Sequence, residues 1–311
     1  MFEFLKKAAQ QAADGGKASL QSTLYMLQHP QFLWYPFLHI FSIIMVLLLW
    51  FGTIVGLVAL KGHSKIALFV LSLLTVPYFA FVFFSSLSAC ATTYYAIGHF
   101  NNDPITVSES YIMAFKKTGM LLKWMIINTF VKFLVKAGTG RQLRLFSIGA
   151  LLDLSWTMTT FFIFPIIATK ETGIVESMKE SYTLMKENFG LNSGALITFS
   201  LVRGVVGRTI FSFCFFIATL GIMIFQPEVA TNFYHFIHTV IKTGSGTLDD
   251  FTLVRIIFTI GVISIVIPSA LMATARAIFK TAVYQFTQDK PSGPFNAHTI
   301  KTVSQAEDPT A

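Results

Sequence analysis

The stretch FFIFPIIATKETGIVESMKESYTLMKENFG, residues 161–190, decides the fold. Apolar residues around Pro165 continue to Lys170, and a short polar segment, residues 171–173, follows them. Residues 175–188 then place apolar side chains on one side of a helix and charges on the other. The stretch predicts a transmembrane helix that turns, through a polar elbow, into a helix lying on the membrane surface.

The composition of the whole chain agrees with a membrane location. Of 311 residues, 54% are hydrophobic and 12% are charged, whereas a soluble domain has about 25% charged residues. Backbone groups in hydrocarbon must be paired within their own segment, so helices of about 20 apolar residues are expected. We therefore predict an all-α, polytopic membrane helix bundle. The net charge of +8 comes from basic residues that flank apolar runs, which indicates anionic lipid rather than nucleic acid as the partner.

Six transmembrane helices are predicted within a membrane domain of residues 32–285. An interfacial amphipathic segment, residues 1–31, precedes this domain, and a polar tail without periodicity, residues 286–311, is expected to be disordered. The spans are residues 32–60, 66–95, 119–135, 146–169, 191–225 and 253–279.

The third predicted span is the least apolar, because it contains Lys123, Asn128 and Lys132. A charge near the bilayer centre costs ~2.5–3.5 kcal/mol. Both lysines lie near the ends of the segment, where a long side chain can reach the interface. We therefore expect a span that packs against other helices of the protein.

Three amphipathic surface helices share a short motif. QSTLYM (residues 21–26), ESYIM (109–113) and ESYTLM (180–185) each precede a pair of apolar spans. The surface helices are expected at residues 19–28, after a break at Gly15-Gly16, at 107–117 and at 175–188. Two interpretations stand: a repeat of surface helix plus hairpin used three times, or short identities that arose by chance.

Two spans separate each surface helix from the next, so all three are expected on one face of the membrane. Basic residues are more numerous on that face, which carries Lys6, Lys7, Lys17, Lys116, Lys117, Lys170, Lys179, Lys186, Lys280, Lys290 and Lys301. The other face carries Lys61, Lys65, Lys136, Arg141, Arg144 and Lys242. The excess predicts a multi-pass inner-membrane protein with both termini cytoplasmic, although the basic turn at 136–144 opposes this orientation.

The pattern Trp156…Pro165…Glu171-x-Gly173…Ser181…Gly190 resembles an uncharacterised family of prokaryotic six-helix membrane proteins, catalogued as a domain of unknown function. That family is similar in layout to the membrane domain attached to some glycerophosphodiester phosphodiesterases. The resemblance covers residues 19–285, including Phe279-Lys280-Thr281-Ala282-Val283-Tyr284 after the last span, and implies architecture but no activity. The chain has Asn188-Phe189-Gly190 where a tryptophan is expected before the glycine.

Pro165, Glu171 and Ser181 are candidate functional residues at the elbow. A proline within a span frees a carbonyl group, and a carboxylate at a helix start accepts backbone N–H groups and interacts favourably with the helix dipole. The same three residues have a purely structural interpretation, in which they only fix the angle between two helices.

Three intramembrane charges form a second candidate set. Asp153 lies in the fourth span, and Arg203 and Arg208 lie in the fifth among small residues that permit close helix packing. With the predicted threading, Asp153 and Arg208 reach similar depth and can form a buried pair. Alternatively, both arginines extend to the inner surface and Asp153 to the outer one.

No signature of catalysis or metal binding occurs in the sequence. His235 and His238 are three residues apart, but a zinc site needs three or four protein ligands and no others lie nearby. Cys90 and Cys214 fall inside apolar runs and are expected to be buried thiols. GxSxG, HExxH and phosphate-cradling glycine loops are absent. We expect no enzymatic activity, no cofactor and no metal.

Two functions fit these observations. In the first, three cytoplasmic surface helices organise membrane lipids or dock a protein partner. In the second, the protein is a small permease or flippase-like transporter of an amphiphilic, lipid-like substrate, because Pro77, Pro165 and Pro268 interrupt spans that also carry charge. The absence of paired acidic relays favours the first. No oligomeric state follows from the sequence.

Overall fold

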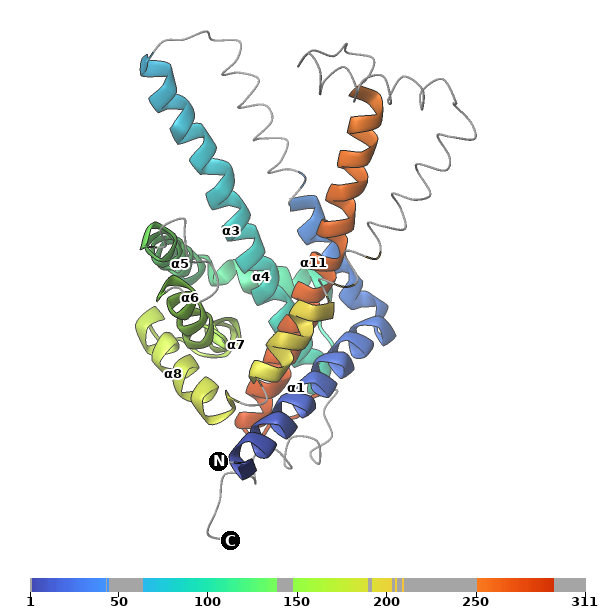
Figure 1. Ribbon diagram of the computed structural model, residues 1–311. Helices are drawn as coiled ribbons and strands as arrows, with labels where there is room; N and C mark the ends of the chain where they lie inside the picture. The colour runs from blue at the N-terminus through green and yellow to red at the C-terminus, as the bar shows by residue number, and fades with distance from the viewer. Residues whose placement is uncertain are drawn as a thin grey trace. The chain divides into compact units, whose positions relative to one another are not determined.

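The computed structural model describes residues 2–42, 44, 64–138, 148–189, 192–202, 205, 209 and 251–293. The chain divides into two compact units, Met1–Phe199 with Ala273–Ala311, and Ser200–Met272, and each is described by itself. All regular structure in the described part is helical (Figure 1), which confirms the all-α fold class.

The first unit begins with α1, a single helix over Phe2–Gln28. The predicted break at Gly15-Gly16 is wrong. A Cβ atom on Gly16 would lie 2.9 Å from Thr198 Oγ1, so the missing side chain lets α1 approach the helix Asn192–Val202 closely. This close packing outweighs the helix propensity of glycine, which is only about 1 kcal/mol less favourable than that of alanine.

An aromatic cluster joins the end of α1 to α3, which covers Ser64–Phe100. Between them lie the 3-10 turn η1 (Pro30–Leu33) and a helix that begins at residue 34. Tyr25 OH lies 2.9 Å from His99 Nδ1, and the ring of Phe32 packs edge-on against Tyr95 at 4.8 Å. Both Phe32 and Tyr35 are fully buried, so this cluster forms one part of the core.

The second predicted surface helix is confirmed as α4, Val107–Lys116. Its start is a capping box: the Glu109 N–H donates to Thr106 Oγ1 (3.2 Å), and the Thr106 N–H donates to the Glu109 carboxylate (2.7 Å). The buried Ser110 Oγ and Tyr35 OH share a hydrogen bond of 2.6 Å, which holds α4 on the segment after α1. After the turn at Lys117, α5 (Thr118–Gly138) begins at once.

The fourth predicted span is not one helix. It is described as α6 (Ile148–Thr159) and α7 (Ile163–Thr169), separated by a turn at residues 160–162. Pro165 has no N–H to donate to the carbonyl four residues earlier, and its ring would clash with that carbonyl in a continuous helix. The chain therefore starts a new helix, in whose first turn the missing N–H costs nothing.

The third predicted surface helix is confirmed as α8, Ile174–Glu187, which packs against α6 and α7. The helix Asn192–Val202 follows. The last helix, α11, covers Phe251–Thr287 with Pro268 inside it, and its residues from Ala273 onward belong to the first unit. The sixth span was predicted to end at Phe279, but the helix continues to Thr287.

Three helices of the described part are long and apolar enough to cross a membrane: Phe79–Phe100, Thr118–Val135 and Val266–Thr287. The second of them is the predicted third span, in which Lys123 and Lys132 are exposed. Ser155–Thr169 and Asn192–Val202 are apolar but shorter. Several predictions lie outside the described residues, among them most of spans 32–60 and 191–225, His235 and His238, Cys214, and tail residues 294–311.

Candidate functional site

A side chain of α8 accepts a hydrogen bond from a backbone N–H at the helix break that Pro165 makes. The Phe162 N–H, at the turn between α6 and α7, donates to Ser181 Oγ at 2.9 Å. Phe162, Pro165 and Ser181 are all buried, so this N–H has no access to water and needs a partner within the protein. The sequence groups Pro165 with Ser181, and the structure places the Ser181 hydroxyl against the turn three residues before Pro165.

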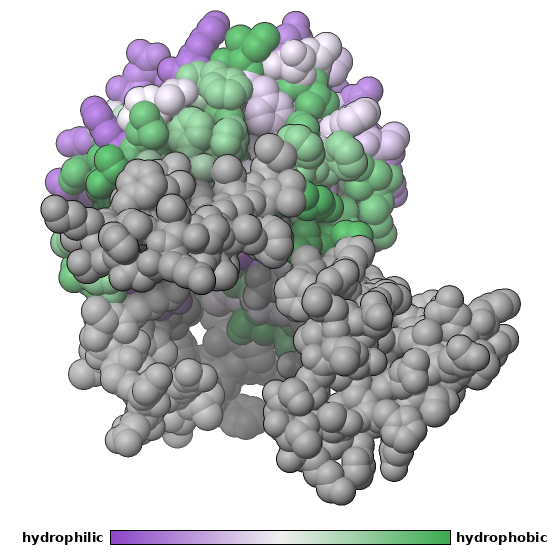
Figure 2. Space-filling model, turned by 90° about the horizontal axis from the view of Figure 1, so that it is seen from above, coloured by the Kyte–Doolittle hydropathy of each residue, from purple (hydrophilic) through white to green (hydrophobic). Residues whose placement is uncertain are grey.

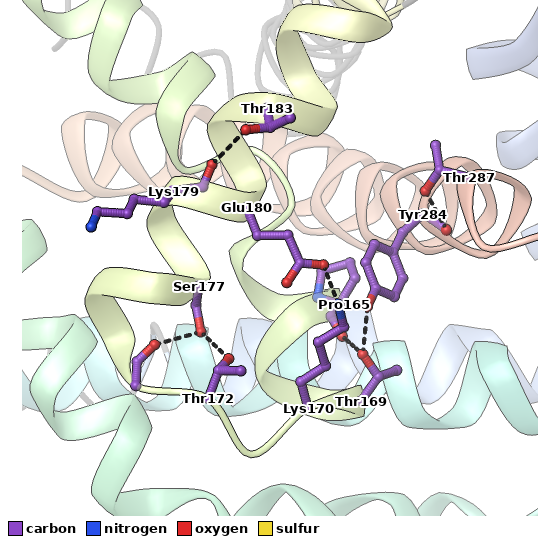
Figure 3. A network of polar contacts seen from close by, with 11 residues as sticks. Pro165, Thr169, Lys170, Thr172, Ser177, Lys179, Glu180, Thr183, Tyr284 and Thr287 are labelled. Atoms are coloured by element: carbon purple, nitrogen blue, oxygen red, sulfur yellow. Dashed lines mark hydrogen bonds and ion pairs between the residues drawn. The ribbon is translucent and has the colours of Figure 1, made fainter.

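The elbow after α7 is tied to α8 and to α11 (Figure 3). Thr169 Oγ1 donates to the Pro165 carbonyl at 2.8 Å and lies 2.9 Å from Tyr284 OH of α11. One residue later, Lys170 Nζ donates to the Glu180 carboxylate of α8 at 2.7 Å. The hydrogen bond to Glu180 raises the pKa of Lys170. Three helices therefore meet at the elbow through polar contacts.

Lys117 connects the elbow to the turn between α4 and α5. Its Nζ lies 3.5 Å from Glu171 Oε1 and donates to the Lys170 carbonyl at 3.4 Å. The Glu171 side chain is 95% exposed, and a solvated ion pair contributes ~0–1 kcal/mol. Glu171 therefore sits at the surface of the elbow, and the N-cap of α8 is Gly173. Thr172 Oγ1 lies 3.0 Å from Ser177 Oγ, which donates to the Gly173 carbonyl at 2.9 Å.

A cavity of about 150 Å³ lies beside the elbow, between α3, α7 and α11. Among the described lining residues, the charged ones are on α11, and the others are apolar or carry a hydroxyl. The residues that line it include Ala89 and Thr93 of α3, Phe164 and Pro165 of α7, and Arg276 and Lys280 of α11. Thr281 Oγ1 donates to Thr93 Oγ1 at 3.4 Å, which holds α11 against α3 at this level.

Lys280 is placed against an aromatic ring. Its Nζ lies 4.4 Å from the ring centre of Phe161, at the break between α6 and α7. A cation–π contact contributes ~0.5–2 kcal/mol, which is less than the ~2.5–3.5 kcal/mol that a lysine costs near the centre of a span. The sequence had assigned Lys280 to a flanking basic group, but the structure places it within the apolar helix Val266–Thr287. The contact with Phe161 therefore offsets only part of this cost.

Arg276 lies one turn before Lys280 on the same helix. Its Cζ lies 5.6 Å from the ring centre of Phe199, whose own ring packs edge-on against Phe279. Residues four apart lie on one face of a helix, so both cations face the same side of α11. This spacing was visible in the sequence and is the signal by which the pair could have been found.

A further polar contact joins α5 to α6. Trp156 Nε1 donates to Asn128 Oδ1 at 3.0 Å, and the Trp156 ring stacks on Trp124 at 5.9 Å with an interplanar angle of 8°. Asn128, one of the three residues that make the third predicted span the least apolar, thus has a partner within the protein.

Of the remaining predicted site residues, the structure describes Asp153, which does not join this cluster. Asp153 is exposed on α6. Arg203 and Arg208 lie outside the described residues, so the Asp153–Arg208 pair stays a prediction. Within the described part of the chain, no group of three or more His, Cys, Asp or Glu side chains is arranged to hold a metal ion.

Comparison with known protein families gives a match over most of the chain. Residues 62–295 match the family described as "Family of unknown function (DUF6159)". No curated protein and no solved structure matches the chain. The match covers α3 to α11, including the elbow, the cavity and Lys280, and so extends over most of the chain. The chain therefore belongs to the family of unknown function DUF6159.

Proposed function

We propose that the protein is a membrane-organising component without catalytic activity, whose surface helices α1, α4 and α8 lie in the lipid interface. The observation that carries this proposal is the side-chain distribution on these helices. Each buries a serine, together with the apolar residue four positions later, and exposes large apolar side chains together with lysines. Helices of this kind bind membranes through buried apolar area and attraction to anionic lipids.

In α1 the two faces are clearly separated. Ser22 and Met26 are fully buried, whereas Leu20, Leu24 and Leu27 are 50%, 56% and 54% exposed. These leucines are spaced four and three residues apart, which places them on one face of the helix. On a soluble protein, an exposed apolar stripe of this kind would promote aggregation. In contact with acyl chains it is stabilising.

The other two surface helices follow the same plan. In α4, Ile112 and Phe115 are exposed beside Lys116, and in α8, Val175 and Tyr182 are exposed among lysines. Figure 2 shows hydrophobic residues reaching the surface of the described part of one face, with hydrophilic residues at its margin. Such a surface favours lipid contact over contact with water.

The motif serines support a threefold repeat. Ser22, Ser110 and Ser181 occupy the same place in the QSTLYM, ESYIM and ESYTLM motifs, and all three are fully buried. The residues four positions later, Met26, Ala114 and Met185, are also buried. We infer from this that each repeat consists of a surface helix and two spans, giving six spans. The excess of basic residues on the face of the surface helices supports an inner-membrane protein with both termini cytoplasmic.

Lipid contact of α1 can be measured directly. An environment-sensitive fluorophore is attached at Leu24→Cys, with Asp103→Cys in the exposed loop as the control, after Cys90 and Cys214 are replaced by alanine. In nanodiscs we expect blue-shifted emission at position 24, quenched by spin-labelled lipid, and water-like emission at 103. Water-like emission at both positions would refute the interfacial role and favour a protein partner on this face.

A second candidate function, transport of an amphiphile, is favoured by one observation. Pro165 interrupts an apolar segment beside a cavity that carries Lys280, and transporters build their sites at broken helices within the membrane. Uptake of a fluorescent lipid analogue into proteoliposomes, compared with empty liposomes, distinguishes this candidate from an organising role.

A further inference from the structure

We propose that the cavity between α3, α7 and α11 binds a phosphate group, presented either by the headgroup of an acidic phospholipid or as free inorganic phosphate. The proposal deepens the transport candidate, which uses the same cavity. Binding at equilibrium does not depend on transport, so an experiment can refute phosphate binding and transport separately.

The first argument is charge. Arg276 and Lys280 both line the cavity from one face of α11, and like charges four residues apart on a helix repel each other. Among the described residues, none with an acidic side chain lines the cavity. The ion pairs among the described residues are Lys17–Asp14, Lys117–Glu171 and Lys170–Glu180, so none of them neutralises Lys280. Its ammonium group contacts the Phe161 ring. An anion in the cavity would offset the cost of placing the Lys280 charge within the apolar helix Val266–Thr287.

The second argument is the kind of donors present. A guanidinium group provides a planar fork of N–H donors, an ammonium group provides a compact charge, and both are common ligands of phosphate. The hydroxyl of Thr93, which is buried on the opposite wall, already donates to the Ala89 carbonyl at 3.0 Å. The two cations would therefore be the main ligands, and a phosphate group offers them several separate oxygen atoms, whereas a halide ion is a single acceptor.

The third argument is size and position. A cavity of about 150 Å³ inside a protein is large enough to hold benzene. It therefore has room for a phosphate group but not for a whole phospholipid, whose acyl chains would have to remain outside. Lys280 lies seven residues from the end of the helix Val266–Thr287, or ~10 Å along its axis. A lipid headgroup that moves a short distance below the interface can reach this depth.

The elbow forms part of the same site. Phe164 and Pro165 make the wall that faces α11, and their position is fixed by the Ser181 contact to Phe162 and by the Thr169 contact to Tyr284. The break in the fourth span therefore positions one wall of the cavity. It also positions the Phe161 ring, which contacts Lys280.

The test uses the full-length protein in detergent, with two probes. Native mass spectrometry measures retention of phosphatidylglycerol against phosphatidylcholine, and thermal unfolding is followed with inorganic phosphate against chloride at equal ionic strength. A ligand that binds only the folded state raises the unfolding midpoint. We expect selective retention of the acidic lipid, or a midpoint shift with phosphate but not chloride. The first result identifies a headgroup and the second a soluble anion.

Variants assign the binding to the cavity. Lys280→Gln should weaken binding of the effective probe at least tenfold, while Lys280→Arg should retain it. Lys290→Gln, an exposed lysine just after α11, is the matched control and should bind as the wild type does. Ala273→Leu fills the cavity from an exposed position of α11 and leaves every charge in place, so it should also abolish binding.

The outcomes are decisive in both directions. Equal binding by wild type, Lys280→Gln and Ala273→Leu would overturn the proposal, as would no response to either probe. If Lys280→Gln does not fold, the comparison of Ala273→Leu with Lys280→Arg tests the proposal, because both variants keep the charge on α11. Binding without lipid uptake would remove the transport candidate and leave the site.

Discussion

At the residue scale, the elbow depends on single hydrogen bonds between groups far apart in the sequence. Pro165 could be recognised from the sequence as a helix breaker, and the motif singled out Ser181. The partner of Ser181 could not be predicted, because it is a backbone N–H nineteen residues earlier that becomes available only when the helix breaks. Lys280 was interpreted as a flanking charge because its aromatic partner, Phe161, is distant in the chain.

Removing the Ser181 hydroxyl should destabilise the protein. Ser181→Ala leaves the buried Phe162 N–H without a partner, which costs ~1–3 kcal/mol of the free energy of unfolding. Thr183→Ala, an exposed hydroxyl on the same helix, is the control and should change this free energy by no more than ~0.5 kcal/mol. Unfolding in a denaturing detergent measures both. An equal decrease in the free energy of unfolding in the two variants would show that the Ser181 hydrogen bond does not stabilise the protein more than an exposed one.

The start of α4 should weaken in acid. Hydrogen bonds from the Thr106 backbone and side chain lower the pKa of Glu109 in the folded protein. The capping contribution is therefore complete above the unfolded pKa of the carboxyl group and is lost as the pH falls through the folded pKa. Amide hydrogen exchange in α4, corrected for intrinsic pH dependence, should show this loss in the wild type but not in Glu109→Gln. A parallel response in the two proteins would contradict the assignment.

At the scale of elements, periodicity predicted the surface helices well. α4 and α8 begin and end within one residue of the expected positions, because an amphipathic pattern and polar boundaries are local features. Gly15-Gly16 misled the prediction, since the contact between Gly16 and Thr198 is long-range. The fourth span was predicted as one helix because its apolar composition continues across the break that Pro165 imposes.

Two glycines in helices should respond oppositely to alanine. A Cβ on Gly98 would lie 2.8 Å from the Asp103 carbonyl oxygen, while a Cβ on Gly119 would meet nothing within 4 Å. Gly119→Ala should therefore stabilise the protein by ~0.5–1 kcal/mol through helix propensity alone. Gly98→Ala should destabilise it, because the backbone at Asp103 must move and its N–H bond to the Gly98 carbonyl is strained. Stabilisation by both substitutions would show that this turn is loosely packed.

At the scale of the whole molecule, the all-α class followed from composition, and membership of DUF6159 agrees with the expected resemblance to an uncharacterised family. Helices of sufficient length and apolarity match the predicted second, third and sixth spans. The number of spans and their orientation could not be derived from local pattern alone. Pro165 divides the fourth apolar segment into two helices, and Asn128 makes the third segment less apolar. Their partners, Ser181 and Trp156, are supplied by the folded chain.

The measurement that tests the central claim most directly is the sidedness of the three surface helices. Single cysteines at Lys17, Lys116 and Lys186, which are exposed on α1, α4 and α8, are placed in the protein lacking Cys90 and Cys214. They are labelled with a membrane-impermeant maleimide in right-side-out and inverted vesicles. The account predicts that all three react only in inverted vesicles. Labelling of any one of them from the opposite side would contradict a single cytoplasmic layer of surface helices.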